Sequence, residues 1–101
     1  MKTKFIPDAL ILSISRPKKH VKEPPQFVVC KTDEWAVVAL KWDQRRTLAI
    51  RWFTTPMGNP SSHGYPTWYI LPEELHESIL DFAAKEQHTC VDKIKDYLNN
   101  K

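Results

Sequence analysis

The chain has only two cysteines, two glycines and no long hydrophobic run, and each scarcity argues against a class of protein. A secreted domain of this size usually carries more cysteine, so Cys30 and Cys90 are expected to be buried thiols rather than a disulfide. No apolar stretch reaches the ~18 residues of a membrane span. Pro7 and Asp8 interrupt the basic N-terminal residues before a signal-like stretch forms. We therefore expect a cytoplasmic protein that does not associate with membranes.

Charge is divided unevenly along a chain whose 101 residues fit a single domain, residues 1–101. Residues 1–52 carry eleven Lys and Arg against five acidic residues, a net charge of +6. Residues 53–101 carry four against seven, a net charge of −3. This asymmetry favours a polyanionic partner for the first half. Ordinary solubility charge explains it equally well.

The hydrophobic pattern predicts strands first and helices last. Residues 9–15 alternate, which predicts a strand, and residues 16–26 form a basic loop with three prolines. Four further strands are predicted with short turns between the first three, which favours antiparallel pairing. Their ranges are 27–31, 35–42, 46–53 and 67–71. The intervening loop 54–66 holds both glycines, three prolines and no charged residue.

Residues 72–99 predict the helical part of the chain. Pro72 suits a first helical turn, and Glu73 and Glu74 complement the helix dipole. Apolar residues then recur at helical spacing, weakening at 86–88. The predicted class is α+β, an antiparallel sheet of four to five strands followed by one long or two short C-terminal helices. Its parts are an N-terminal strand and basic loop (1–26), the sheet (27–71) and the helical segment (72–99).

Catalytic and metal motifs are weak. His76-Glu77 lacks a second histidine four residues after the first, where Leu80 stands. His63 is a candidate general base, with Arg51 to stabilise charge, in a small nuclease or other hydrolase. The loop around His63 supplies no orienting acid. We therefore expect a protein without metal or cofactor, and catalysis is a minor hypothesis.

Aromatic and basic residues concentrate on neighbouring predicted strands. Such a surface binds single-stranded nucleic acid by stacking bases and neutralising phosphates. Tryptophan is highly buried on average, so at least two of the four tryptophans are expected in the core. Trp35 and Trp42 are seven residues apart and point to opposite faces, so the tryptophans cannot all share one function. The leading hypothesis is a non-enzymatic module that binds single-stranded DNA or RNA. Its candidate residues are Lys41, Trp42, Arg45, Arg46, Arg51, Trp52 and Tyr65.

The uncharged loop supports an alternative hypothesis of a different kind. Loops on rigid scaffolds often carry binding sites, so loop 54–66 and the residues after it could recognise a protein or a small ligand. The candidate residues for this second site are Asn59, Ser62, His63, Tyr65 and Trp68.

The order of strand, strand, strand, long loop, strand and helix across about sixty residues resembles one known family. It is similar to the transcriptional coactivator positive cofactor four and its whirly-like, bacterial and phage relatives. The matching pieces are the hairpin of 35–42 and 46–53, loop 54–66, and the run Leu71-Pro72-Glu73-Glu74 into the helix. The resemblance implies a homodimer that grips single-stranded DNA with its sheets, and the basic residues 16–22 fit it. The chain also resembles small orphan proteins of phages and mobile gene cassettes.

Overall fold

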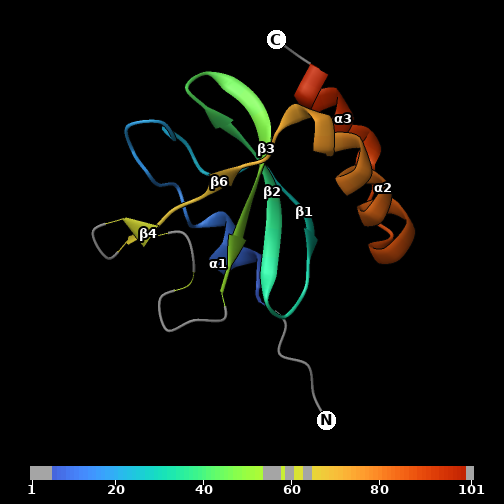
Figure 1. The fold of residues 1–101 in the computed structure, drawn as a ribbon, viewed down its shortest axis with the longest axis horizontal. Helices are drawn as coiled ribbons and strands as arrows, with labels where there is room; N and C mark the ends of the chain where they lie inside the picture. Colours follow the sequence, from blue (N-terminus) through green and yellow to red (C-terminus); the bar gives the residue numbers. More distant parts are fainter. Residues whose placement is uncertain (1–5, 54–57, 59–60, 63–64, 100–101) are drawn as a thin grey trace.

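The computed structural model describes residues 6–53, 58, 61–62 and 65–99. A four-stranded antiparallel sheet has the N-terminal segment on one face and two C-terminal helices on the other (Figure 1). The predicted α+β class is therefore confirmed. Within the described residues, none of the helices has the length and apolar character needed to cross a bilayer.

The sheet has the order β1-β2-β3-β6, and each neighbouring pair is antiparallel. Its strands are β1 (Phe27–Lys31), β2 (Trp35–Trp42), β3 (Arg45–Trp52) and β6 (Tyr69–Ile70). β2 and β3 are paired along their whole length, from Trp35 opposite Trp52 to Trp42 opposite Arg45. Asp43 and Gln44 connect them with φ values of 53° and 73°, the positive pair that a two-residue type I′ turn requires.

Strand alternation gives the sheet two buried faces. Ala36, Val38 and Leu40 point to what we call the N-terminal face, which Ile11 and Ile14 cover. Val37 and Ala39 of the same strand point to the helical face, where they pack with Leu80 and Ile94 among others. All five central residues of β2 have no exposed surface, so neither face of this strand is open to solvent.

The strand predicted for residues 9–15 is wrong. Residues Asp8–Leu12 form the short helix α1, which follows Pro7 in an extended conformation. Ile11 and Ile14 are both buried against the sheet, whereas Leu10 is half exposed. The buried residues are therefore Ile11 and Ile14, three positions apart, rather than the alternating set Leu10, Leu12 and Ile14. Over so few apolar residues the two periods are hard to distinguish.

The region after β3 also differs from the prediction. The strand expected at 67–71 is reduced to the two residues of β6, and a small separate hairpin precedes it. That hairpin pairs β4 (Ser61–Ser62) with β5 (Tyr65–Pro66) inside the predicted loop. Thr67 and Trp68 are buried between the hairpin and β6. The indole Nε1 of Trp68 donates a 2.9 Å hydrogen bond to the carbonyl of Ile14, which ties this segment to the N-terminal one.

The C-terminal segment forms two helices, one of the two arrangements that the sequence left open. A 3₁₀ turn, η1 (Glu73–Leu75), leads into α2 (His76–Gln87), and α3 (Val91–Asn99) follows. His88 ends α2 in the left-handed conformation, with φ of 56°. The N–H groups of His88 and Thr89 both donate to the carbonyl of Ala83, which closes the end of the helix.

The end of α2 also covers the edge of the sheet. The side-chain amide of Gln87 accepts from the N–H of Lys31 (2.8 Å) and donates to its carbonyl (2.5 Å). The hydroxyl of Thr89 donates to the carbonyl of Val29 at 2.8 Å. Side chains thus satisfy the outer backbone groups of β1, which would otherwise be a template for another strand.

Candidate functional site

The predicted nucleic-acid residues do not share one face of the sheet. In the β2–β3 register Lys41 lies opposite Arg46, whereas Trp42 lies opposite Arg45. Lys41, Arg46 and Trp52 therefore belong to the helical face by alternation, and Trp42, Arg45 and Arg51 belong to the N-terminal face. Because both faces are covered at their centre, the open basic sheet face of the sequence hypothesis is not formed.

Four of these residues do meet at the end of the β2–β3 hairpin. Trp42, Arg45 and Arg46 line one cavity of about 210 Å³ there, and Lys41 borders a smaller cavity beside it. Arg46 is held by α3, because its guanidinium donates to the carbonyl of Tyr97 (3.2 Å) and lies 4.7 Å from that ring's centroid. Arg45 is largely exposed, and its nearest acidic atom is an oxygen of Glu73 at 3.5 Å.

Arg51 and Trp52 lie at the opposite end of β3. Arg51 is buried, and its Nη1 donates to the carbonyl of Thr67 at 3.3 Å. Burial lowers the pKa of its guanidinium, because desolvation penalises the charged form. Gly58 packs against Arg51 with φ of +72°, and a Cβ at that position would stand 2.3 Å from Nη2. Trp52 is 38% exposed on the helical face, so the two neighbours do not act on one surface.

The basic loop 16–22 is fixed to the hairpin end by His20. The imidazole stacks on the indole of Trp42, with centroids 4.8 Å apart and planes 6° from parallel. Its Nδ1 lies 2.8 Å from both carboxylate oxygens of Asp43, whose backbone N–H donates to the carbonyl of His20 at 2.9 Å. Val21 is fully buried beside it. The loop therefore has a defined path.

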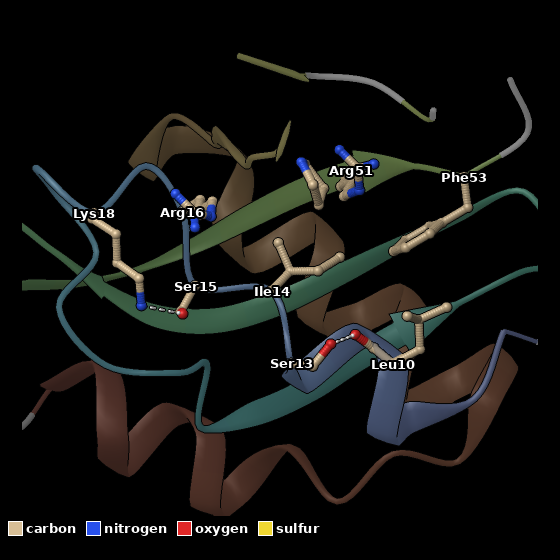
Figure 2. A pocket seen from close by; sticks show the side chains of 9 residues that line it. Leu10, Ser13, Ile14, Ser15, Arg16, Lys18, Arg51 and Phe53 are labelled. Carbon is tan, nitrogen blue, oxygen red and sulfur yellow. Dashed lines mark hydrogen bonds between the residues drawn. The ribbon is translucent and has the colours of Figure 1, made fainter. Parts of the chain in front are cut away.

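The first part of this loop borders a larger cavity on the N-terminal face (Figure 2). The cavity has a volume of about 410 Å³. Its basic lining residues are Arg16, Lys18 and Arg51, and Figure 2 shows Arg16 and Arg51 along one side of it. Phe53 and Leu10 form an apolar wall at the end of the cavity away from Lys18. Lys18 reaches the hydroxyl of Ser15 at 2.9 Å.

Together these features form what we call the basic track. It starts at Arg16 and Lys18 beside Arg51, follows the exposed Lys19 and Lys22, and ends at the hairpin. Lys22 and Lys41 border the same small cavity with His20 and the acidic Glu23, and Arg45 lies across the turn. Sequence reasoning identified the basic loop but drew its site residues from the strands. The signal was present, as Lys18, Lys19, His20 and Lys22 between Pro17 and Pro24.

The second predicted site is described only in part. Asn59 and His63 lie outside the described residues, as do the side chains of Ser62 and Tyr65. The hypothesis of His63 as a general base therefore stays a prediction. Trp68 is 3% exposed and bonded to Ile14, so it belongs to the core.

No group of three or more His, Cys, Asp or Glu that could hold a metal ion occurs in the described part of the chain. No protein-family model matches the sequence, and neither curated proteins nor solved structures give a match. The resemblance to the positive cofactor four family therefore stays a prediction, and function has to be argued from the residues.

Proposed function

We propose that this protein is a non-enzymatic module that binds single-stranded nucleic acid along the basic track. The observation that carries the proposal is the fixation of loop 16–22 on the hairpin by His20, Trp42 and Asp43. Lys18, Lys19 and Lys22 of this loop are exposed, with Lys18 beside the larger cavity and Lys22 beside the cavity at the hairpin. Successive cations at fixed positions suit the successive phosphates of a strand.

An aromatic surface next to the cations favours a single strand over a duplex. The rings of His20 and Trp42 are half-buried and stacked on each other, and an unpaired base would extend this stack. A duplex is more often read by a helix placed in the major groove. Here the long helices α2 and α3 lie on the other face of the sheet and belong to an acidic segment, since residues 72–99 carry seven acidic residues against three lysines.

The test is a fluorescence-anisotropy titration of a labelled single-stranded oligonucleotide at low and moderate salt. The variant Lys18→Gln/Lys19→Gln/Lys22→Gln should bind at least about ten-fold more weakly at low salt. A plot of the logarithm of the binding constant against the logarithm of the salt concentration should become less steep by about two. Each phosphate contact with a single strand contributes about 0.7 to that slope. The matched control is Lys85→Gln/Lys93→Gln/Lys95→Gln, which removes the same charge from exposed positions on α2 and α3. Equal loss in both variants would show a net-charge effect and would reject the track.

The partner implied by the resemblance, a second copy of this chain, is part of the proposal. Trp52, Tyr69, Leu75 and Phe82 are each 36–48% exposed although large and apolar. Trp52 and Tyr69 both project to the helical face where β3 pairs with β6, on the side away from the track. Such side chains are typical of contact surfaces. Light scattering should give the mass of a dimer, and Trp52→Ser/Tyr69→Ser should give that of a monomer; a wild-type monomer at micromolar concentration would reject the dimer.

A further inference from the structure

A cavity of about 210 Å³ lies at the end of the β2–β3 hairpin, where the basic track ends. The hairpin bounds it on one side and residues 70–73 on the other. Trp42 and Ile70, two of its walls, both project to the N-terminal face by strand alternation, which is the face that the track follows. Its volume is below the roughly 300 Å³ at which pockets for drug-sized ligands begin, so it suits a single flat ring system.

The walls of this cavity are largely apolar. Trp42 supplies its indole, and Ile70, Leu71 and Pro72 supply aliphatic surface. Stacking with His20 already holds the indole in place, so a ring that lies against it meets a preorganised surface. Ile70 is partly exposed, and a ring in the cavity would remove apolar surface of this side chain from water. A nucleic-acid base meets both conditions, since bases stack on aromatic side chains.

Arg45 and Glu73 supply polar groups at the rim of the cavity. The guanidinium Nη2 of Arg45 lies 3.5 Å from one carboxylate oxygen of Glu73, and both side chains are 79% exposed. Among the described residues neither group has another partner, so the second carboxylate oxygen and the remaining guanidinium N–H groups are open to a ligand. The charges of the pair cancel, and Arg46, the third charged residue of the lining, is held by Tyr97. The rim therefore suits a neutral ligand with donors and acceptors of its own.

We propose that this cavity binds one unpaired guanine of the strand on the basic track, an inference that rests on the proposed function. The Watson–Crick edge of guanine presents an acceptor, O6, next to two donors, N1–H and the N2 amino group. In a single strand this edge is free to be read. The two oxygens of Glu73 accept from the two donors, and the guanidinium of Arg45 beside them donates to O6.

The other bases place an acceptor where guanine has a donor. Adenine and cytosine have an unprotonated ring nitrogen in the position of the guanine N1–H, and thymine and uracil have a carbonyl in the position of the N2 amino group. Each of these lone pairs would face the carboxylate of Glu73 and leave it without a donor, which costs binding free energy. Glu73 is therefore the specificity-determining residue of this site, and Trp42 supplies the stacking surface that any base can use.

Fluorescence anisotropy with labelled thymidine oligonucleotides tests the proposal, the central base being thymine, guanine, adenine or hypoxanthine. The guanine oligonucleotide should bind about ten-fold more tightly than the thymine one, as expected for a bidentate base contact. Hypoxanthine is guanine without the N2 amino group, so it stacks as a similar purine but should lose most of this gain. Glu73→Gln has one acceptor fewer and should lose the preference for guanine. Glu74→Gln is the matched control, because this exposed neighbour carries the same charge but does not line the cavity.

Two results would overturn the guanine site and leave the basic track in place. One is salt-dependent binding with equal affinity for the guanine and hypoxanthine oligonucleotides. The other is a preference for guanine that Glu73→Gln retains, or that Glu74→Gln loses to the same extent. The preference is a ratio measured within each variant, so a general gain in affinity from removing an acidic residue does not affect it. Absence of binding by all four oligonucleotides would instead reject the track, and the guanine site with it.

Discussion

The two faces of this sheet are covered in different ways. On the helical face, α2 and α3 place Leu80, Ala83 and Ile94 on Val37, Ala39 and Leu48 in an apolar core, with polar contacts such as that of Arg46 with Tyr97 at its margin. On the N-terminal face, a five-residue helix and an irregular loop cover Val38 and Leu40 but leave a cavity beside the buried Arg51. A cavity of about 530 Å³ also lies on the helical side, between Arg46, α2 and α3, but its lining includes Glu73 and Glu77. None of the described residues that line the cavity on the N-terminal face is acidic, so that face is where an anionic strand is expected to bind.

The largest effect should come from breaking the helical face. Leu48 is fully buried among residues of α2, α3 and the sheet, so Leu48→Ala should lower the free energy of unfolding by about 2–5 kcal/mol. Urea denaturation followed by tryptophan fluorescence measures this. The exposed Leu75→Ala should cost less than about 1 kcal/mol. Affinity for single-stranded oligonucleotide should not change under conditions where Leu48→Ala is folded, and a loss there would contradict the division between the faces.

A smaller effect should come from Gly58, the residue that closes over Arg51. Alanine there would have to adopt a φ of +72° with its Cβ 2.6 Å from the carbonyl oxygen of Trp52, which is backbone and cannot move aside. Gly58→Ala should therefore lower the free energy of unfolding by about 1–3 kcal/mol. Ser78→Ala, on the exposed side of α2, is the control and should leave the free energy of unfolding unchanged. Unchanged stability in Gly58→Ala would mean that the contact with Arg51 is not tight.

The comparison also shows what could be predicted from the sequence. β1, β2 and β3 were located within one residue, because β-branched and aromatic residues are frequent in β2, residues alternate in β3 and the connections are short. The split between α2 and α3 was visible as a weakening of the periodicity near 86–88. The strand predicted at 9–15, where α1 lies, was wrong because so short an apolar segment fits both the helical and the strand period. These are local patterns, and they suffice for most of the fold.

The site depends on contacts that local patterns do not contain. The basic and aromatic residue types of the site were identified from the sequence. That Arg45 and Arg46 point to opposite faces of the sheet became important only because the structure covers both faces. Trp68 became a core residue through a bond to Ile14, fifty-four positions earlier in the chain. The path of loop 16–22 depends on His20 meeting Trp42 and Asp43. Such contacts arise from tertiary packing, and no sequence period reports them.

An effect smaller than that of Gly58→Ala is expected at the edge of the sheet. Gln87 bonds both backbone groups of Lys31, so Gln87→Ala should leave them unsatisfied and cost about 1–2 kcal/mol. Glu86→Ala removes a neighbouring exposed side chain and serves as the control. Hydrogen exchange should be faster at Lys31 in Gln87→Ala than in wild type. Unchanged exchange and stability would show that the side chain contributes little to the edge.

The smallest effect separates the two thiols without changing the fold. Burial raises the pKa of Cys30 to about 11, whereas Cys90 is exposed. Since thiolate is the reactive form, one thiol should react quickly with a disulfide reagent at pH 8 and the second only after denaturation. Cys90→Ser should remove the fast phase. Because the folded pKa exceeds the ordinary value of 9.0, this thiol's contribution to stability should be present below pH 9 and lost as the pH rises to about 11. Two fast thiols would contradict the burial of Cys30.

The four tryptophans test the central claim most directly, because they report on both faces in one spectrum. Their indole N–H signals can be followed by ¹⁵N–¹H correlation spectroscopy while a single-stranded oligonucleotide is added. The account predicts a large shift for Trp42, which stacks on His20 in the track, and little change for Trp35 and Trp52 on the helical face. The buried Trp68 should not lose its bond to Ile14. Shifts confined to Trp35 and Trp52 would place the ligand on the helical face and contradict the account.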